Sequence, residues 1–552
     1  MTIKQFILSG LTLLVTFLIS VSLLGSWTKP QVQSQLDLYQ TNLLLHAAEW
    51  QGLAPEDNQQ DPARNALIGS EPLQDALEQY QKVRNSAQKA LSAASISPEP
   101  ELDLELGSQP VQRSPRETDS QLVDELDLRL GLLYAQTGQT EQALQTWTNL
   151  ISQPKAQSSL KQLVQTAQVL LGLWSQPPRL LPEAEQQLQK HLTGWFRYQA
   201  LAQLYQLQQR QDALALLQAE EQKTAESALL RLSIVGGMPA LGGLIGFVLV
   251  IFWVGRDVLS LRRGRRASLV SQMGVSTRGS LSEKSSALPT EVIASRPVGG
   301  SEALPSSQTS LKPAWSVPWH IETIWQVMVF WFTAFFTVSL ILVPLVVKLL
   351  GLQPATFGPR TQAYFALFSY GLLMIVGLSI LYLCLKPFLE QPQKWLPINW
   401  RGNWFWWGIG GYLAALPLVI LVSLVNQRLL EDQGGGNPIL EIILQSKDNL
   451  TIAILLGMVA VLAPFFEETL FRGFFLTSLT RYLPGWGAIA LSGLLFAIAH
   501  LNLSDILPLT VLGMVLGYVY TRSGNLLSSM LMHSLWNSGS FLGLLILGSS
   551  SR

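Results

Sequence analysis

Charged residues are scarce in this sequence. The 552-residue chain is 48% hydrophobic and only 13% charged, whereas a soluble globular protein carries about a quarter charged residues. The deficit is concentrated in several nearly uncharged stretches, each long enough to cross a bilayer core of ~30 Å as a helix. This pattern excludes an ordinary soluble protein and predicts an all-α, polytopic membrane helix bundle.

Cysteine and net charge are also nearly absent. The single cysteine, Cys384, lies in an apolar stretch, which excludes an intrachain disulfide and a cysteine-rich metal site. The charges sum to zero, so no basic surface points to nucleic acid. We therefore expect the lipid bilayer and a protein or peptide substrate as partners, and no nucleic acid.

The front of the chain predicts a membrane anchor followed by a helical domain. The apolar run 6–27 follows Lys4 and is longer than that of a cleaved signal peptide, so we expect residues 1–28 to form an uncleaved transmembrane anchor. Residues 29–233 are rich in Gln, Leu, Ala and Glu with helical periodicity. Within them, two segments resemble tetratricopeptide (TPR) repeats, in which small residues let two antiparallel helices touch. The first segment contains Leu130, Gly131, Tyr134, Gly138, Ala143 and Trp147, and the weaker second contains Leu201, Tyr205 and Ala213.

An ordinary helical bundle is the alternative to this TPR-like domain. In either case the domain is better suited to binding a protein partner than to chemistry. A second transmembrane helix is expected at 234–261, and the four arginines between residues 262 and 266 mark its cytoplasmic end. Residues 29–233 are therefore predicted outside the cytoplasm.

The rest of the chain predicts a linker and a second membrane domain. Residues 262–320, rich in Ser, Pro and Gly, are expected to form a disordered cytoplasmic linker. The membrane domain at 321–550 has candidate helices at 322–350, 361–387, 403–427, 449–480, 485–501, 505–521 and 525–548. With the first two this makes about nine transmembrane helices. The expected location is a bacterial plasma or internal membrane.

The last four candidate helices contain ionisable residues, which cost at least ~2.5 kcal/mol each deep in a bilayer and usually mark function. Glu468 and Arg472 are four residues apart, so they share a helix face and are expected to form an ion pair. Glu467 is rotated about 100° from its neighbour. It is therefore free to act as a partly desolvated general base.

Helix arithmetic places the other polar residues at a similar depth. Glu467 precedes Pro484 by 17 residues and His500 follows it by 16, so both lie roughly 25 Å from the turn between their helices. His533 and Asn537 lie roughly 14 and 20 Å along the last helix and share one face. A carboxylate, two imidazoles and an amide are thus expected to converge.

Three motifs follow one another in this region: Glu467-Glu468-xxx-Arg472, Phe496-xxx-His500 and His533-xxx-Asn537. Together they resemble the CPBP intramembrane protease family, also called the CAAX-processing or Abi family, over residues 400–548. The resemblance implies that Glu467 and His500 activate a water for peptide hydrolysis and that His533 and Asn537 stabilise the oxyanion. Glu468 and Arg472 would support Glu467, and Phe496 would pack beside His500.

Two questions stay open at this point. Zinc is one candidate cofactor, and its donors would be Glu467, His500 and His533, although no His-Glu-x-x-His pattern is present. The expected function is a membrane-embedded endopeptidase, with prenylated CAAX proteins as one candidate substrate class. The alternative is a non-catalytic membrane scaffold or bacteriocin-immunity-type protein that binds partners through its TPR-like domain.

Overall fold

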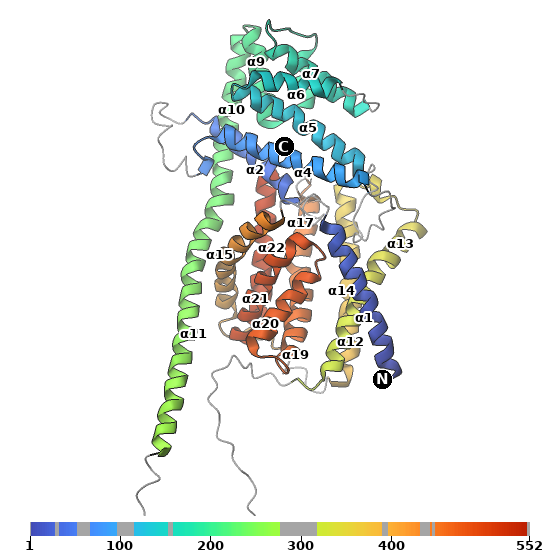
Figure 1. The fold of residues 1–552 in the computed structure, drawn as a ribbon, viewed down its shortest axis with the longest axis vertical. Helices are drawn as coiled ribbons and strands as arrows, with labels where there is room; N and C mark the ends of the chain where they lie inside the picture. The colour runs from blue at the N-terminus through green and yellow to red at the C-terminus, as the bar shows by residue number, and fades with distance from the viewer. Residues whose placement is uncertain are drawn as a thin grey trace, which may run out of the picture.

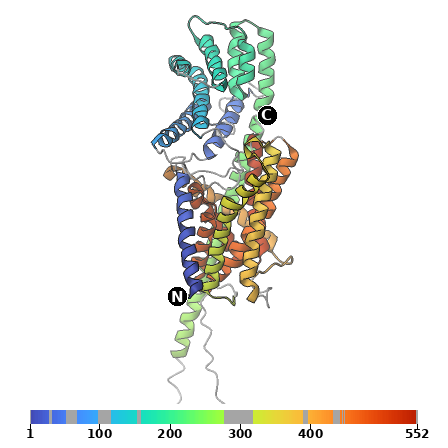
Figure 2. The same cartoon turned by 90° about the vertical axis from the view of Figure 1, so that its right-hand side faces the viewer.

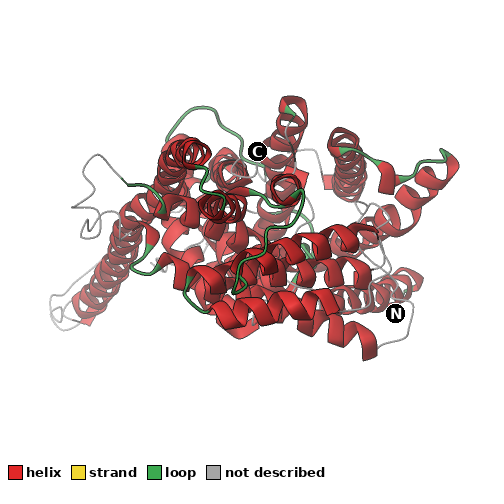
Figure 3. Cartoon of the chain, turned by 90° about the horizontal axis from the view of Figure 1, so that it is seen from above, coloured by secondary structure: helices red, strands yellow, loops and turns green. Residues whose placement is uncertain are grey.

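The computed structural model describes residues 2–27, 32–51, 67–96, 115–152, 158–276, 317–388, 396–430, 442–443, 446 and 448–548. Within these ranges the chain forms helices and contains no strand, as Figure 3 also shows. The predicted all-α fold class is confirmed.

The helices of the front half are α1 (Ile3–Trp27), α2 (Val32–Ala48), α4 (Pro72–Ile96), α5 (Pro115–Gln136), α6 (Thr140–Ser152), α7 (Ser158–Trp174), α8 (Ala184–His191), α9 (Gly194–Leu207), α10 (Gln211–Leu232), η2 (Ser233–Gly237) and α11 (Met238–Ser276). Those of the membrane domain are α12 (Ile321–Thr337), η3 (Val338–Leu342), α13 (Val343–Leu349), η4 (Pro354–Thr356), α14 (Pro359–Leu385), η5 (Lys386–Phe388), α15 (Trp404–Leu430), α17 (Asn449–Gly457), η7 (Met458–Leu462), α18 (Ala463–Glu468), η8 (Thr469–Leu476), α19 (Thr477–Leu479), α20 (Gly485–Ile498), η9 (Leu503–Asp505), α21 (Ile506–Ser523) and α22 (Leu526–Gly548).

Eight helical segments in the described part of the chain are long and apolar enough to cross a membrane. The chain is therefore an integral, multi-pass membrane protein, and eight of the about nine predicted crossings are found among the described residues. The exception is α20, whose 14 residues reach only ~21 Å. It ends early because the backbone reverses at Leu501, which has a left-handed φ of 56°, and α21 then runs back beside it.

The molecule has two tiers. Figure 1 shows the front-half helices α4–α10 stacked on one end of the membrane bundle, with the N-terminus at the opposite end and the C-terminus near the helical tier. The turned view in Figure 2 shows the same order along the long axis. Residues 29–233 and the C-terminus thus lie on the same side of the bundle.

Positively charged loops gather at the other end of the bundle. Lys4 pairs with Glu322 at the start of α12, at 3.0 Å. Arg481, which follows α19, donates hydrogen bonds to the carbonyl oxygens of Val317 and Trp319. The positive-inside rule predicts that this end faces the cytoplasm.

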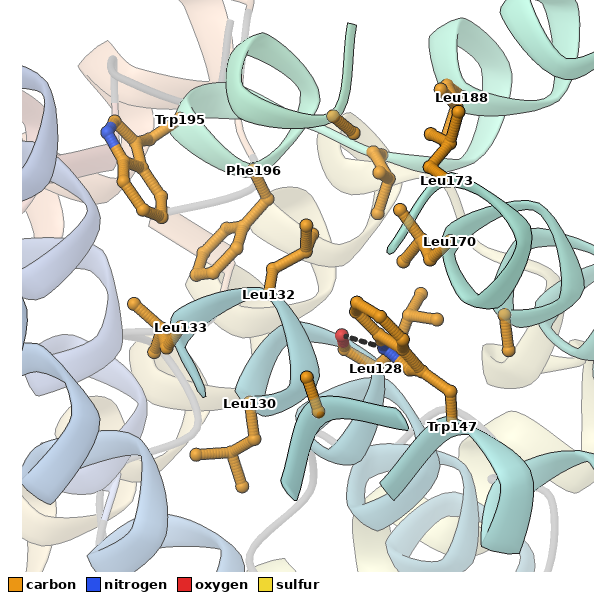
Figure 4. Close-up of a cluster of buried hydrophobic side chains, with 14 of the residues drawn as sticks. Leu128, Leu130, Leu132, Leu133, Trp147, Leu170, Leu173, Leu188, Trp195 and Phe196 are labelled. Carbon is orange, nitrogen blue, oxygen red and sulfur yellow. Dashed lines mark hydrogen bonds between the residues drawn. The ribbon is translucent and has the colours of Figure 1, made fainter. Parts of the chain in front are cut away.

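The core of the helical tier depends on one close approach between α5 and α6. A Cβ on Gly131 would lie 2.2 Å from Nε1 of Trp147, so only glycine fits there. The indole Nε1 of Trp147 donates a hydrogen bond to the carbonyl oxygen of Leu128 at 3.1 Å, as Figure 4 shows. The chain turns between the two helices at Gly138, whose φ is 81°. This is the small-against-large packing expected from the sequence, and the assignment to TPR repeats stays a prediction.

The two tiers are connected by a continuous helix. The helix α10 passes through the π-helical turn η2 into α11 without a break. In addition, α2 and α10 pack against the end of α22 through Leu43, Leu232 and Leu547. Inside the bundle Asp257 of α11 forms an ion pair with Arg522 of α21.

The linker starts later than expected. We predicted disorder from residue 262, but α11 continues to Ser276. Residues 262–276 contain two glycines and no proline, and adding residues to an existing helix is much easier than starting a new one. Residues 277–316 of the predicted linker lie outside the described part of the chain.

Candidate active site

The three motifs lie on three packed helical segments. The glutamates end α18 and the arginine lies in η8, which packs against α20. Helix α22, with the third motif, packs against both α18 and η8. The second motif spans the last turn of α20 and the reversal that follows it.

The innermost feature is a fully buried ion pair. Nη1 of Arg472 lies 2.7 Å from Oε1 of Glu468, and both side chains have an exposed fraction of 0%. Nη2 of Arg472 also donates to the carbonyl oxygen of Gly513 on α21, at 3.1 Å. The guanidinium lies over the ring of Phe496 at 4.6 Å. The ion pair expected from the four-residue spacing is therefore confirmed, and it joins three helices.

His533 lies between the two glutamates. Its Nδ1 is 3.0 Å from Oε1 of Glu468, and its Nε2 is 3.8 Å from Oε2 of Glu467. A carboxylate only accepts hydrogen bonds, so the proton of this contact is on Nδ1. Glu468 therefore fixes the orientation of the imidazole and directs Nε2 toward Glu467.

Glu467 is the more accessible of the two glutamates. Its side chain is 17% exposed, compared with 0% for Glu468. Its Oε1 accepts a hydrogen bond from the hydroxyl of Tyr370 on α14, at 3.1 Å. Its Oε2 is buried and has no hydrogen-bond partner among the described residues. The two oxygens of this carboxylate thus have different environments.

His500 is partly buried and is oriented by its own helix. Its Nδ1 lies 2.8 Å from the carbonyl oxygen of Phe496, so Nδ1 carries the proton and Nε2 is free to accept one. The Phe496 ring contacts both histidines, with centroids 4.9 Å from His500 and 5.7 Å from His533. Within the described residues, His500 and Glu467 form no direct hydrogen bond or ion pair, so the ring of Phe496 is what connects the two parts of the site.

The loop that follows His500 is held by helices far away in the sequence. The backbone N–H of Leu503 donates to the hydroxyl of Ser26 on α1, at 3.1 Å. The side-chain amide of Asn426 on α15 donates to the carbonyl oxygen of Ser504, at 2.7 Å. The N-terminal anchor therefore takes part in positioning the second motif.

Asn537 has a structural partner in the helical segment that leads to the two glutamates. In the π-helical turn η7, the N–H of Ala463 donates to Met458, which removes the usual donor from the carbonyl of Val459. The next residue, Pro464, has no N–H to replace it. Nδ2 of Asn537 donates to this carbonyl instead, at 2.7 Å. One amide proton of Asn537 is therefore used, and the second stays available.

The donors expected for zinc are only partly assembled. No group of three or more His, Cys, Asp or Glu side chains within the described residues is arranged to hold a metal ion. Among the expected donors, His533 and Glu467 lie 3.8 Å apart. We therefore assign no chemical step to a metal.

A family comparison matches the segment that carries these residues. Residues 449–539 match the family model described as type II CAAX prenyl endopeptidase Rce1-like. The chain carries an Rce1-like domain. No curated protein and no solved structure matches the chain. The Rce1-like match begins at α17 and ends within α22, so it contains all three motifs.

Sequence reasoning found every residue of the three motifs but missed the residues that hold them. Tyr370 and Ser26 both lie outside the Rce1-like segment, 97 and 477 residues from their respective partners. Neither belongs to a local pattern. A polar residue in an apolar helix is the one signal that Tyr370 offers, and many tyrosines give the same signal.

Proposed function

We propose that the Rce1-like domain is a membrane-embedded endopeptidase in which Glu467 activates a water molecule. The observation that carries this proposal is Oε2 of Glu467, which has no hydrogen-bond partner among the described residues and lies 3.8 Å from Nε2 of His533. A water molecule that enters between these two atoms would form a hydrogen bond with both. The family description supports a CAAX-type endopeptidase in general terms.

In the proposed reaction, Oε2 of Glu467 takes a proton from the water while the water oxygen attacks the peptide carbonyl carbon. The electron pair of the carbonyl moves to its oxygen, which becomes an oxyanion. His533, protonated and held by Glu468, donates its Nε2–H to this oxygen. The oxyanion then re-forms the C=O bond as the C–N bond breaks, and Glu467 returns the proton to the leaving nitrogen.

Two further residues have proposed roles in this reaction. Nε2 of His500 would accept the second hydrogen of the water, because its Nδ1 is held by Phe496. The second amide N–H of Asn537 would donate to the oxyanion, while the first continues to hold Val459. Glu468 and Arg472 neutralise one another, so they add no net charge to the apolar interior.

We propose that the substrates are proteins cleaved near a membrane-associated carboxyl terminus, and that the helical tier recruits them or a protein partner. The support for recruitment is the continuous α10–α11 helix, which connects this tier to the domain. Crosslinking from the surface of the tier in cells would identify the bound proteins.

The test compares cells that express wild type, Glu467→Gln or His533→Gln at equal membrane levels. Protein termini in the membrane fraction would be quantified by mass spectrometry. New termini that disappear in both variants are expected, and purified protein should cleave the corresponding peptides with or without a prenyl group. Identical termini in all three strains would contradict the proposal and favour a non-catalytic scaffold.

A further inference from the structure

Tyr370 is the nearest polar contact of Glu467 outside the three motifs. It lies on α14, and its hydroxyl donates to Oε1 of Glu467 at 3.1 Å. Its ring packs edge-on against Phe466, with centroids 6.3 Å apart. The contact therefore joins α14 to the helix that carries both glutamates, and the ring packing fixes where the hydroxyl points.

The hydroxyl makes the two oxygens of Glu467 unequal. Oε1 has a donor, whereas Oε2 is buried, has no partner among the described residues and faces His533 at 3.8 Å. We propose that Tyr370 is a positioning residue that determines which oxygen of Glu467 acts as the base. This inference rests on the proposed hydrolytic function.

The proton transfers of the proposed reaction follow from this geometry. One O–H bond of the water breaks and its proton goes to Oε2, while the water oxygen forms a bond to the carbonyl carbon. Tyr370 keeps its own proton throughout, because it continues to donate to Oε1. When the C–N bond breaks, its electron pair stays on nitrogen, which takes the proton from Oε2. Glu467 ends as a carboxylate that still accepts from Tyr370.

The position of the donor also has a consequence for Glu467 at rest. The hydrogen bond from Tyr370 holds Oε1 and so keeps Oε2 facing His533. Without it, the carboxylate of Glu467 is no longer held in one orientation, and neither oxygen is fixed opposite His533. A carboxylate that is turned away activates the water less often, so the rate of the chemical step should fall while substrate binding is unchanged.

Tyr370→Phe tests this role because it removes the hydroxyl and keeps the ring contact with Phe466. The matched control is Tyr382→Phe, on the same helix but 56% exposed. The first readout is the reaction of Glu467 with dicyclohexylcarbodiimide, a reagent for carboxyl groups in apolar surroundings. Labelling of the full-length protein in nanodiscs would be followed by mass spectrometry. Loss of the hydrogen bond that holds Oε1 frees this oxygen to attack the reagent, so Glu467 should react about ten-fold faster.

The second readout is peptide cleavage by the same nanodisc samples. Tyr370→Phe should lower kcat about ten-fold at unchanged KM, with no effect of Tyr382→Phe. Wild-type labelling and wild-type cleavage in Tyr370→Phe would overturn the proposal. If the wild type cleaved none of the peptides, the proposed function would be refuted. The labelling experiment alone would then test the role of Tyr370. Faster labelling would then still support Tyr370 as the residue that holds Glu467, and equal labelling would refute it.

Discussion

The buried pair of Arg472 and Glu468 allows a quantitative prediction. Arg472→Met keeps the approximate volume of the side chain but leaves the carboxylate of Glu468 buried without its cation. Breaking a buried ion pair by removing one partner costs about 3–5 kcal/mol. The variant also loses the hydrogen bond to Gly513 and the stacking on Phe496. These terms are not additive, so we expect the free energy of unfolding to fall by at least ~3 kcal/mol.

The double variant Glu468→Gln/Arg472→Met separates the missing cation from the loss of packing. It removes both charges, so it should be clearly more stable than Arg472→Met alone. The matched control is Arg360→Met, which breaks the exposed ion pair with Asp448. This variant should have little effect on the free energy of unfolding.

Reversible unfolding in mixed detergent micelles, followed by pulse proteolysis, would give these differences. A loss below ~1 kcal/mol in Arg472→Met would refute the assignment of this pair as the stabilising centre of the site.

Three further predictions concern the parts around the site. Asn537→Leu should lower the free energy of unfolding by about 1–3 kcal/mol, because the Val459 carbonyl loses its donor, and Pro464→Ala should reduce this loss in the same unfolding assay by supplying an N–H. Ser26→Ala should lower the cleavage rate several-fold without changing membrane levels, because it frees the loop after the second motif; an unchanged rate would contradict this. Burial raises the pKa of the Glu49 carboxyl above 4.5, so the folded helical tier favours the protonated form and loses stability as pH rises through that range. Glu49→Gln should therefore raise Tm by about 2 °C at pH 7 but not at pH 4, and an equal shift at both values would count against this reasoning.

The sequence predicted the buried ion pair of the site because its motif is local. Four-residue spacing places Glu468 and Arg472 on one face whatever the rest of the chain does, and the structure has this pair. Helix rise placed Glu467 and His500 at the same depth, but within the described residues these two form no hydrogen bond or ion pair. Glu467 lies 3.8 Å from His533 instead. The sequence also predicted the membrane helices, since hydrophobic length requires no knowledge of neighbouring helices.

What the sequence missed depends on contacts between distant segments. The short α20 is as apolar as a spanning helix, and its end is set by the left-handed backbone at Leu501. The π-helical turn η7, which leaves the Val459 carbonyl to accept from Asn537, has no simple residue pattern. Tyr370 reaches Glu467 only because α14 packs beside the helix that carries it. Contacts of this kind can be identified only when the packing of the helices is known.

The central claim is that Glu467 activates water, and its most direct test is the cleavage rate of purified full-length protein in nanodiscs. The substrate would be a peptide found from the membrane-fraction termini. Glu467→Gln should lower kcat by about 10²–10⁴-fold, the typical contribution of a general base, with an unchanged unfolding midpoint. The control Glu322→Gln, whose side chain is 44% exposed, should match wild type. Equal rates for wild type and Glu467→Gln would contradict the account.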